Sequence, residues 1–303
     1  MKIILFFISI CLFVSCSPQK NSNQNSNQNS KENSENNSSE NINENTGSEK
    51  TQVDKTTEEF RDDIQNIIDS AGLTGSILIF DPQSKVYYSN DFKRCSTGFI
   101  PASTFKIPNS IIALETGVAK DDSTIYKWDG KKKFLPQWEQ DLILKDAFQF
   151  SCVPCYQQIA REIGTLKMKE YLKKLDYGNM IVDSSNIDKF WLEGDSKISQ
   201  LQQIGFLKKF YNSELPISER TSEIMKRIMI LDENDSYKLS GKTGWAVRGE
   251  KNLGWFVGYV ETDGKVYYFA ANVEPKENFD MEKFAGIRSK ITLQALRKSG
   301  FIN

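Results

Sequence analysis

The chain has 303 residues, and its 39 Lys and Arg residues nearly balance its 40 Asp and Glu residues, giving a net charge of −1. This balance, without a basic stripe, argues against a nucleic-acid-binding protein. The sequence contains no histidine, which excludes Ser-His-Asp and Cys-His catalysis and the histidine-containing zinc sites. Any general base must therefore be Lys, Glu, Asp or a group made from one of them.

The first sixteen residues predict export. Lys2 precedes an apolar run over residues 3–14, and Ser15 and Cys16 follow it. One positive charge, about twelve apolar residues and a small residue before the cysteine are typical of a signal peptide over residues 1–15, too short for a permanent membrane span. Residues 13–16 are similar to a bacterial lipobox, with Phe13 in place of the usual Leu. We predict lipidation of Cys16 and a membrane-tethered periplasmic protein, with plain secretion as the alternative.

Residues 16–56 predict a linker after the lipidated cysteine. Between Asn21 and Lys50 the one large apolar residue is Ile42, and most positions are Asn, Ser or Glu. Such a segment cannot recover its ordering entropy by burying apolar surface, so we expect it to be disordered. It is either a spacer that holds a domain off a membrane or a low-complexity tail. Residues 57–303 remain for one large domain or two closely associated ones.

The folded part is expected to begin with strands over residues 75–80 and 85–89, joined by a turn at Asp81 and Pro82. A helix follows from Ser103 to about Gly117. Apolar residues then recur with a helical period in residues 142–150, 155–163, 168–175, 198–211 and 218–231.

Strands return near the end of the chain, over residues 237–241, 254–260 and 265–271. The last two flank Thr262-Asp263-Gly264, a strong hairpin signal, and residues 288–299 form a final helix. Strands at both ends with a helical middle imply an antiparallel sheet built from distant segments, with an inserted helical subdomain. A cleft between these two parts is the natural place for a site.

The start of the helix at Ser103 has a pattern that suits catalysis. Ser103 and Lys106 are three residues apart, which places them about 5–6 Å apart on one helix face. Lys106 is then close enough to take the hydroxyl proton, directly or through one water. The helix N-terminus favours an oxyanion, and apolar neighbours would desolvate the amine and lower its pKa. The alternative is that Ser103 is an ordinary helix cap.

Of the five cysteines, Cys11 belongs to the signal and Cys16 to the anchor, which leaves Cys95, Cys152 and Cys155. Cys152 and Cys155 form a Cys-x-x-Cys pair that could be redox-active or disulfide-bonded in an exported protein. The interpretation we favour is two small, buried thiols near a helix start. Without a second pair, a zinc site is not expected.

Three further stretches accompany Ser103 and Lys106 in a fixed order: Ser151-Cys152-Val153, Tyr177-Gly178-Asn179 and Lys242-Thr243-Gly244-Trp245. Together they resemble the serine penicillin-recognising enzymes and, among these, the class D β-lactamases or oxacillinases. The resemblance covers nearly all of residues 58–303 and is most specific at residues 101–110, 150–164, 171–179, 190–194 and 240–245. It implies an α/β (α+β) fold of the β-lactamase/transpeptidase type, with a central antiparallel sheet flanked by helices.

The resemblance also implies a mechanism. Ser103 would be the nucleophile that opens the lactam ring and forms an acyl-enzyme. In this family the lysine that corresponds to Lys106 is carboxylated by carbon dioxide and acts as the base in both half-reactions. Trp191 matches a tryptophan whose indole N–H binds this carbamate, and Val153 and Leu192 match the apolar pair beside the deacylating water. No metal and no other cofactor is expected.

The remaining matches concern the leaving group and the substrate. Ser151 would relay a proton to the lactam nitrogen, and Lys242 would supply positive potential. The substrate carboxylate would be bound by Thr243 and Arg288, with Arg297 as a nearby alternative. The other matches are the backbone N–H groups of Ser103 and Trp245, as the oxyanion hole, and Gly244, as part of the substrate site; Tyr177 and Asn179 are interpreted as structural.

We therefore expect a class D serine β-lactamase that hydrolyses penicillins and confers β-lactam resistance, as a monomer or a homodimer. One alternative is a penicillin-binding transpeptidase or carboxypeptidase, against which Trp191, Val153 and Leu192 argue because they are linked to water activation. Another is a β-lactam sensor domain that stays acylated, although such sensors usually follow several membrane helices.

Overall fold

The computed structural model describes residues 56–303, which belong to one compact unit. The predicted signal peptide, the Cys16 anchor and nearly all of the predicted linker lie outside the described residues. Within the described part, no helix is long and apolar enough to cross a membrane.

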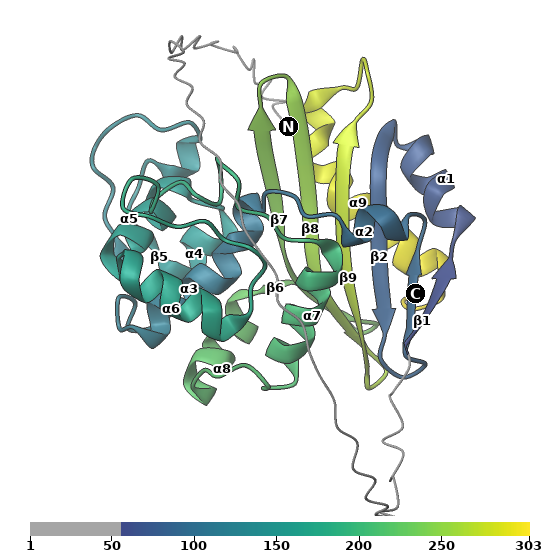
Figure 1. The fold of residues 1–303 in the computed structure, drawn as a ribbon, viewed down its shortest axis with the longest axis horizontal. Coiled ribbons are helices and arrows are strands. Elements are labelled where there is room, and N and C mark those ends of the chain that lie inside the picture. Colours follow the sequence, from purple (N-terminus) through teal and green to yellow (C-terminus); the bar gives the residue numbers. More distant parts are fainter. Residues whose placement is uncertain (1–55) are drawn as a thin grey trace, which may run out of the picture. The chain divides into compact units, whose positions relative to one another are not determined.

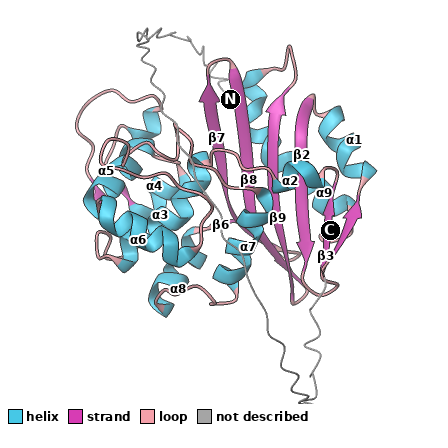
Figure 2. Cartoon of the chain, in the orientation of Figure 1, coloured by secondary structure: helices cyan, strands magenta, loops and turns pink. Residues whose placement is uncertain are grey.

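A seven-stranded sheet forms the centre of this unit (Figure 2). Its strand order is β1-β3-β2-β9-β8-β7-β6, and only the β1–β3 pair is parallel among these neighbours. The strands are β1 (Thr57–Phe60), β2 (Leu73–Asp81), β3 (Val86–Ser89), β6 (Ile230–Glu233), β7 (Lys238–Arg248), β8 (Lys251–Thr262) and β9 (Lys265–Pro275). The expectation of an antiparallel sheet assembled from both ends of the chain is confirmed.

The longest strands of the sheet are joined by tight turns. Thr262 pairs with Lys265 across the β8–β9 hairpin, so Asp263 and Gly264 form a two-residue turn. Both have positive φ, +47° and +73°, as a type I′ turn requires. The predicted hairpin is therefore confirmed.

Helices cover both faces of the sheet because alternate strand residues are apolar on both sides. In β2, Ile77 and Ile79 belong to a core shared with α1 (Asp62–Ser70) and α9 (Phe284–Lys298), whereas Leu78 and Phe80 belong to the core of the opposite face. A strand that is buried on both faces in this way lies inside a layered structure.

The helical part of the chain lies between β3 and β6 in sequence. Its helices are α2 (Phe92–Ser96), α3 (Lys106–Glu115), α4 (Leu144–Gln149), α5 (Val153–Ile163), α6 (Thr165–Leu175), α7 (Gln200–Tyr211) and α8 (Glu219–Ile228). Short elements complete the fold: the 3-10 turns η1 (Ala102–Phe105), η2 (Pro136–Trp138) and η3 (Met281–Lys283), and the strand pair β4 (Ile125–Tyr126) and β5 (Leu142–Ile143). In Figure 1 the helices α3, α4, α5, α6 and α8 gather on one side of the unit.

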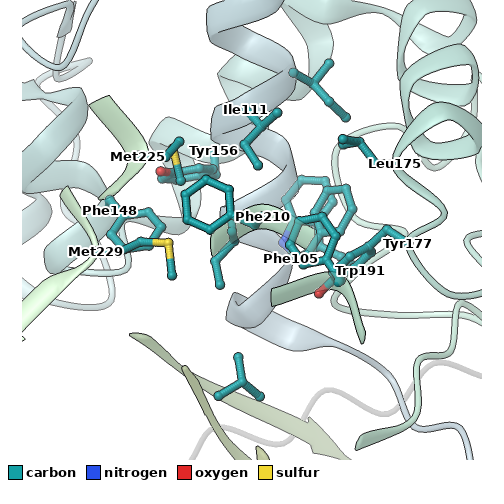
Figure 3. Packing of buried hydrophobic residues seen from close by; sticks show 14 of the residues in the cluster. Phe105, Ile111, Phe148, Tyr156, Leu175, Tyr177, Trp191, Phe210, Met225 and Met229 are labelled. Carbon is teal, nitrogen blue, oxygen red and sulfur yellow. The ribbon is translucent and has the colours of Figure 1, made fainter. Parts of the chain in front are cut away.

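Helix α3 is the centre of this helical subdomain. Its residues 106–114 are all buried, and it contacts α5, α6 and α8. Figure 3 shows the large side chains that surround it, among them Tyr156 and Phe210. A helix that is buried on every side is fixed by packing rather than by its own propensity, so the residues at its N-terminus are held rigidly.

The helices predicted from periodicity are confirmed, and the final helix begins at Phe284, four residues before the predicted Arg288. Several short elements were not predicted: β1, α1, α2, the β4–β5 pair and β6. Leu231 was expected on the helix that begins near Ser218, but α8 ends at Ile228 and Leu231 lies in β6. Strand pairing with β7 determines the conformation there, and local periodicity does not report it.

Candidate active site

The predicted Ser103–Lys106 pair lies at the start of α3. Residues Ala102–Phe105 form the turn η1, which continues directly into the helix. Lys106 Nζ donates a hydrogen bond of 3.0 Å to Ser103 Oγ. Ser103 is 8% exposed and Lys106 is fully buried, so the hydroxyl can meet a substrate while the amine stays out of water.

The surroundings of Lys106 favour a neutral amine. Burial, reinforced by the charge of Lys242, holds the pKa of Lys106 well below its usual range. Its Nζ lies 4.9 Å from the centre of the Tyr156 ring. Within residues 56–303 Lys106 has no carboxylate partner within ion-pair distance. A neutral amine beside a hydroxyl is a group that can accept its proton.

Trp191 is one of several residues with a buried side-chain polar atom that has no hydrogen-bond partner among the described residues; the atom is its indole N–H. The indole stacks on Phe105, with 5.4 Å between ring centres, and both rings are labelled in Figure 3. Its backbone carbonyl accepts the N–H of Ala102 at 2.9 Å, so Trp191 also supports the turn before Ser103. An unpaired buried donor costs about 1–3 kcal/mol, so a hydrogen-bond acceptor brought to this N–H would be stabilised.

Ser151 and Lys242 come together from distant parts of the chain. Ser151 lies between α4 and α5, and Lys242 lies in β7. Lys242 Nζ donates a hydrogen bond to Ser151 Oγ and a second one, of 3.1 Å, to the carbonyl of Thr243. Burial, together with the charge of Arg288, lowers the pKa of Lys242 to about 7. This amine can therefore gain and lose a proton near neutral pH.

Strand β7 lies against the turn that carries Ser103. A Cβ on Gly244 would lie 3.2 Å from the Pro101 carbonyl and from the Thr104 side chain, which is closer than most Cβ contacts, so glycine favours this approach. The next residue, Trp245, is fixed by a 2.9 Å hydrogen bond from its indole N–H to Asn252. Thr243, Gly244 and Trp245 are thereby held beside the start of η1.

Arg288 reaches the same strand from α9. Its guanidinium donates to the carbonyl of Gly244 and to Phe284 and Ala285 of its own helix. Burial lowers its pKa to about 10. A Cβ on Gly254 would lie only 2.6 Å from the Arg288 side chain, so this glycine provides the space that the arginine occupies.

The alternative arginine does not reach this region. Arg297 Nε donates to the Asn303 carbonyl on an exposed surface, whereas Arg288 contacts Gly244. Lys106, Lys242 and Arg288 therefore bring three basic side chains to one region, and none of them has an ion-pair partner within residues 56–303. In the same residues no cluster of acidic, Cys or His side chains could hold a metal ion.

Comparison with known proteins identifies the family. The family described as "Penicillin binding protein transpeptidase domain" matches residues 42–294. The chain is 40% identical to β-lactamase OXA-48 of Klebsiella pneumoniae, over 75% of this chain and 84% of that protein. It is 42% identical to β-lactamase OXA-10 of Pseudomonas aeruginosa, over 76% of this chain and 86% of that protein. The chain belongs to the class D β-lactamases.

Solved structures agree with this assignment. The class D β-lactamase YbXI from Nostoc superposes with a TM-score of 0.75 at 42% identity, covering 78% of this chain and 98% of that one. The resemblance stated from the motifs is thus confirmed, as are the β-lactamase/transpeptidase-like fold and the assignment as an enzyme, a β-lactamase.

In this class D β-lactamase, Tyr177 and its neighbours pack near the turn that carries Ser103. Tyr177 is buried and packs its ring edge-on against Phe105. Gly178 has φ +58°, and a Cβ there would lie 2.7 Å from the Lys197 carbonyl. Asn179 and Lys197 exchange two backbone hydrogen bonds of 2.8 Å. These contacts fit the structural interpretation of the stretch.

One supporting residue was missed in the sequence. Gln203 of α7 donates a 2.9 Å hydrogen bond to Thr104 Oγ1, and that hydroxyl donates to the Pro101 carbonyl at 2.7 Å. These two hydrogen bonds fix the turn around Ser103. Glutamine on the largely apolar face of α7 was the available signal, since a buried amide needs a partner.

The favoured interpretation of Cys152 and Cys155 as thiols is wrong. The two residues form a disulfide, with their Cα atoms 5.4 Å apart. Residues three apart in the first turn of a helix have a Cα separation that allows a disulfide. The sequence spacing alone does not show whether the two sulfur atoms are bonded. Cys95 is the free cysteine among residues 56–303, and burial raises the pKa of its thiol to about 11.

Proposed function

We propose that this β-lactamase hydrolyses penicillins through an acyl-enzyme on Ser103. The 3.0 Å contact between Ser103 Oγ and the buried Lys106 amine is the observation that carries the proposal. Ser103 Oγ attacks the lactam carbonyl carbon, its proton moves to the base at position 106, and the lactam C–N bond breaks with protonation of the nitrogen. The backbone N–H groups of Ser103 and Trp245 stabilise the oxyanion, and each such donor contributes about 3–4 kcal/mol.

We infer that Lys106 is carboxylated by carbon dioxide, which would make bicarbonate the one additive that the reaction needs. Only a neutral amine reacts with carbon dioxide, and burial lowers the pKa of Lys106 and so favours its neutral form. The unpaired indole N–H of Trp191 could donate a hydrogen bond to a carbamate oxygen. When present, the carbamate supplies a carboxylate-like base beside Ser103. The residues of the site therefore fit this modification.

Ser151 and Lys242 are proposed to move the second proton. The hydrogen bond between Lys242 Nζ and Ser151 Oγ connects a titrating amine to a hydroxyl. With its pKa lowered to about 7, Lys242 can hold or release a proton under the conditions of the reaction. Ser151 Oγ would pass a proton to the lactam nitrogen as the C–N bond breaks.

The substrate carboxylate is proposed to bind between Thr243 and Arg288. Arg288 is 5% exposed and has no ion-pair partner within residues 56–303, so an entering carboxylate gains a largely desolvated partner. Lys242 adds positive charge nearby. Val153 and Leu192 are half-buried and pack against the core that contains Trp191; we propose that they bound the space for the deacylating water.

The cellular role is a proposal as well. We propose that the protein is exported, that a lipid on Cys16 tethers it in the periplasm, and that it confers resistance to β-lactams. The signal, lipobox and linker pattern of residues 1–56 supports this proposal.

The nucleophile can be tested by trapping the intermediate. The full chain is mixed with a stoichiometric amount of benzylpenicillin, quenched within milliseconds in acid and digested for peptide mass analysis. We expect one penicilloyl adduct, on the peptide that contains Ser103, and none in Ser103→Ala. An adduct on another residue, or multiple turnovers by the variant, would contradict the proposal.

A further inference from the structure

The Cys152–Cys155 disulfide lies next to two proposed active-site residues. It connects the N-cap of α5 to the first turn of that helix. Ser151 immediately precedes Cys152, and Val153 immediately follows it. Cys152 is 1% exposed and Cys155 is half-buried. The covalent link is therefore part of the segment that presents Ser151 to Lys242.

The backbone of Ser151 needs such support. Its φ is +53°, in the left-handed region that residues other than glycine adopt only when the surrounding structure holds them there. Its N–H donates to Phe148 at 3.1 Å, and the N–H of Cys152 donates to Ala147 at 2.9 Å. These bonds hold the segment to the end of α4.

On the other side, the segment is held to α5. The N–H of Cys155 donates to Cys152 Sγ at 3.2 Å, and the N–H of Tyr156 donates to the Cys152 carbonyl at 3.2 Å. The disulfide closes this first turn covalently. Ser151 is thus fixed between the end of one helix and a cross-linked turn of the next.

We propose that the disulfide positions Ser151 for the proton relay in acylation. Cys152 and Cys155 are positioning residues, since they act through the backbone of Ser151 and through its hydroxyl contact with Lys242. The inference rests on the proposed role of Ser151. Without the link, the turn at residues 151–155 is held by single hydrogen bonds only, and a proton relay displaced by about 1 Å loses on the order of 100-fold in rate.

The test requires a reductant to reach the disulfide, and a cavity beside it offers a route. A cavity of about 210 Å³ is lined by Cys152, Pro154 and Cys155, together with Trp138 and Gln158. A thiolate of dithiothreitol that enters it attacks Cys155 Sγ, the S–S bond breaks, and Cys152 leaves as a thiolate that takes a proton from water. The second thiol of the reagent then closes the oxidised ring and releases Cys155, so two electrons pass from dithiothreitol to the protein.

The test separates acylation from deacylation in the full chain by stopped-flow measurement with a penicillin. We expect Cys155→Ala, and Cys152→Ala with Cys155→Ala, to acylate roughly 10- to 100-fold more slowly, while the deacylation rate stays within about twofold. Dithiothreitol should slow the parent enzyme equally and leave the double variant unchanged. Cys95→Ala, which alters the free buried thiol, is the matched control and should acylate at the parent rate.

Ser151→Ala separates the positioning role of the disulfide from the proposed proton relay by Ser151. If this variant acylates slowly but the reduced parent enzyme, with both thiols verified by mass, acylates normally, the positioning inference is wrong and the proposed function stands. If Ser151→Ala acylates normally, the proposed role of Ser151 fails, and the inference fails with it. Equal slowing of acylation and deacylation by reduction would show that the disulfide only stabilises the fold, which also overturns the inference.

Discussion

At the scale of single residues, the candidate site contains two buried polar side chains. In the described part of the chain, each lacks a partner that such a group usually has. Lys106 is fully buried without a carboxylate, and Trp191 is fully buried with an unpaired N–H. Either group alone would destabilise a core. Together they support the proposal that Lys106 carries a carboxylate.

Trp191→Phe tests this explanation. Hydrogen bonds to charged groups contribute about 1.5–3 kcal/mol, so we expect carboxylation to weaken on the order of 10- to 100-fold. Penicillin turnover without added bicarbonate should fall accordingly and recover as bicarbonate is added. Trp255→Phe is the control, because that indole already donates to the Ile100 carbonyl at 2.9 Å; it should lower stability without creating a bicarbonate requirement. A bicarbonate-independent Trp191→Phe enzyme would contradict the explanation.

Lys242 makes a prediction about stability and pH. Its pKa is about 7 in the folded protein and about 10.4 in an unfolded chain. Between these values the unfolded chain binds a proton that the folded chain does not, so stability rises with pH across this window, by about 1.4 kcal/mol per pH unit at most. In Lys242→Met this contribution is absent. Urea denaturation at several pH values between 7 and 10 measures both slopes, and identical slopes would contradict the lowered pKa.

At the scale of elements, two glycines favour the close packing of β7, β8 and α9 around the candidate site. Gly244 leaves room for the turn before α3, and Gly254 leaves room for the Arg288 side chain. The order of the motifs indicated the Ser103, Ser151 and Lys242 stretches, and the strand patterns at both ends of a helical middle indicated the sheet-plus-helices fold. Spacing did not reveal Gly254, the Gln203–Thr104 contact or the disulfide, because each depends on segments or side-chain positions that meet only in three dimensions.

Gly254→Ala tests the packing of Arg288. The added Cβ would lie 2.6 Å from Arg288 and 2.9 Å from the Phe284 ring, so the arginine must shift away from Gly244. We expect KM for a penicillin to rise roughly 10-fold, as when a charged hydrogen bond worth about 1.5 kcal/mol is lost, with a smaller change in kcat. Gly286→Ala in α9 is the control, since a Cβ there meets nothing within 4 Å. An unchanged KM in folded Gly254→Ala would contradict a role for Arg288 in substrate binding.

At the scale of the whole molecule, the described unit supplies the chemistry and the first 56 residues are proposed to supply the location. In the proposed arrangement, the lipid on Cys16 holds the enzyme at a membrane and the Asn- and Ser-rich linker holds it away from the bilayer surface.

Cys16→Ser tests the anchor. We expect the parent protein to incorporate labelled palmitate and to sediment with membranes, whereas the variant should do neither. Penicillin turnover by the two purified proteins should agree within about twofold, because the anchor lies outside the catalytic unit. Palmitate labelling of Cys16→Ser, or a parent protein found only in the soluble fraction, would contradict the anchor.

The proposed mechanism depends above all on a carboxylated Lys106 that acts as the base beside Ser103. The most direct measurement is penicillin turnover by the full chain in degassed buffer, before and after addition of bicarbonate, with Lys106→Ala alongside. We expect multiple turnovers that increase with bicarbonate, with ¹³C-bicarbonate giving a carbamate signal in the parent enzyme and not in the variant. Turnover that is insensitive to bicarbonate, or a single stoichiometric burst that leaves the enzyme acylated, would contradict it.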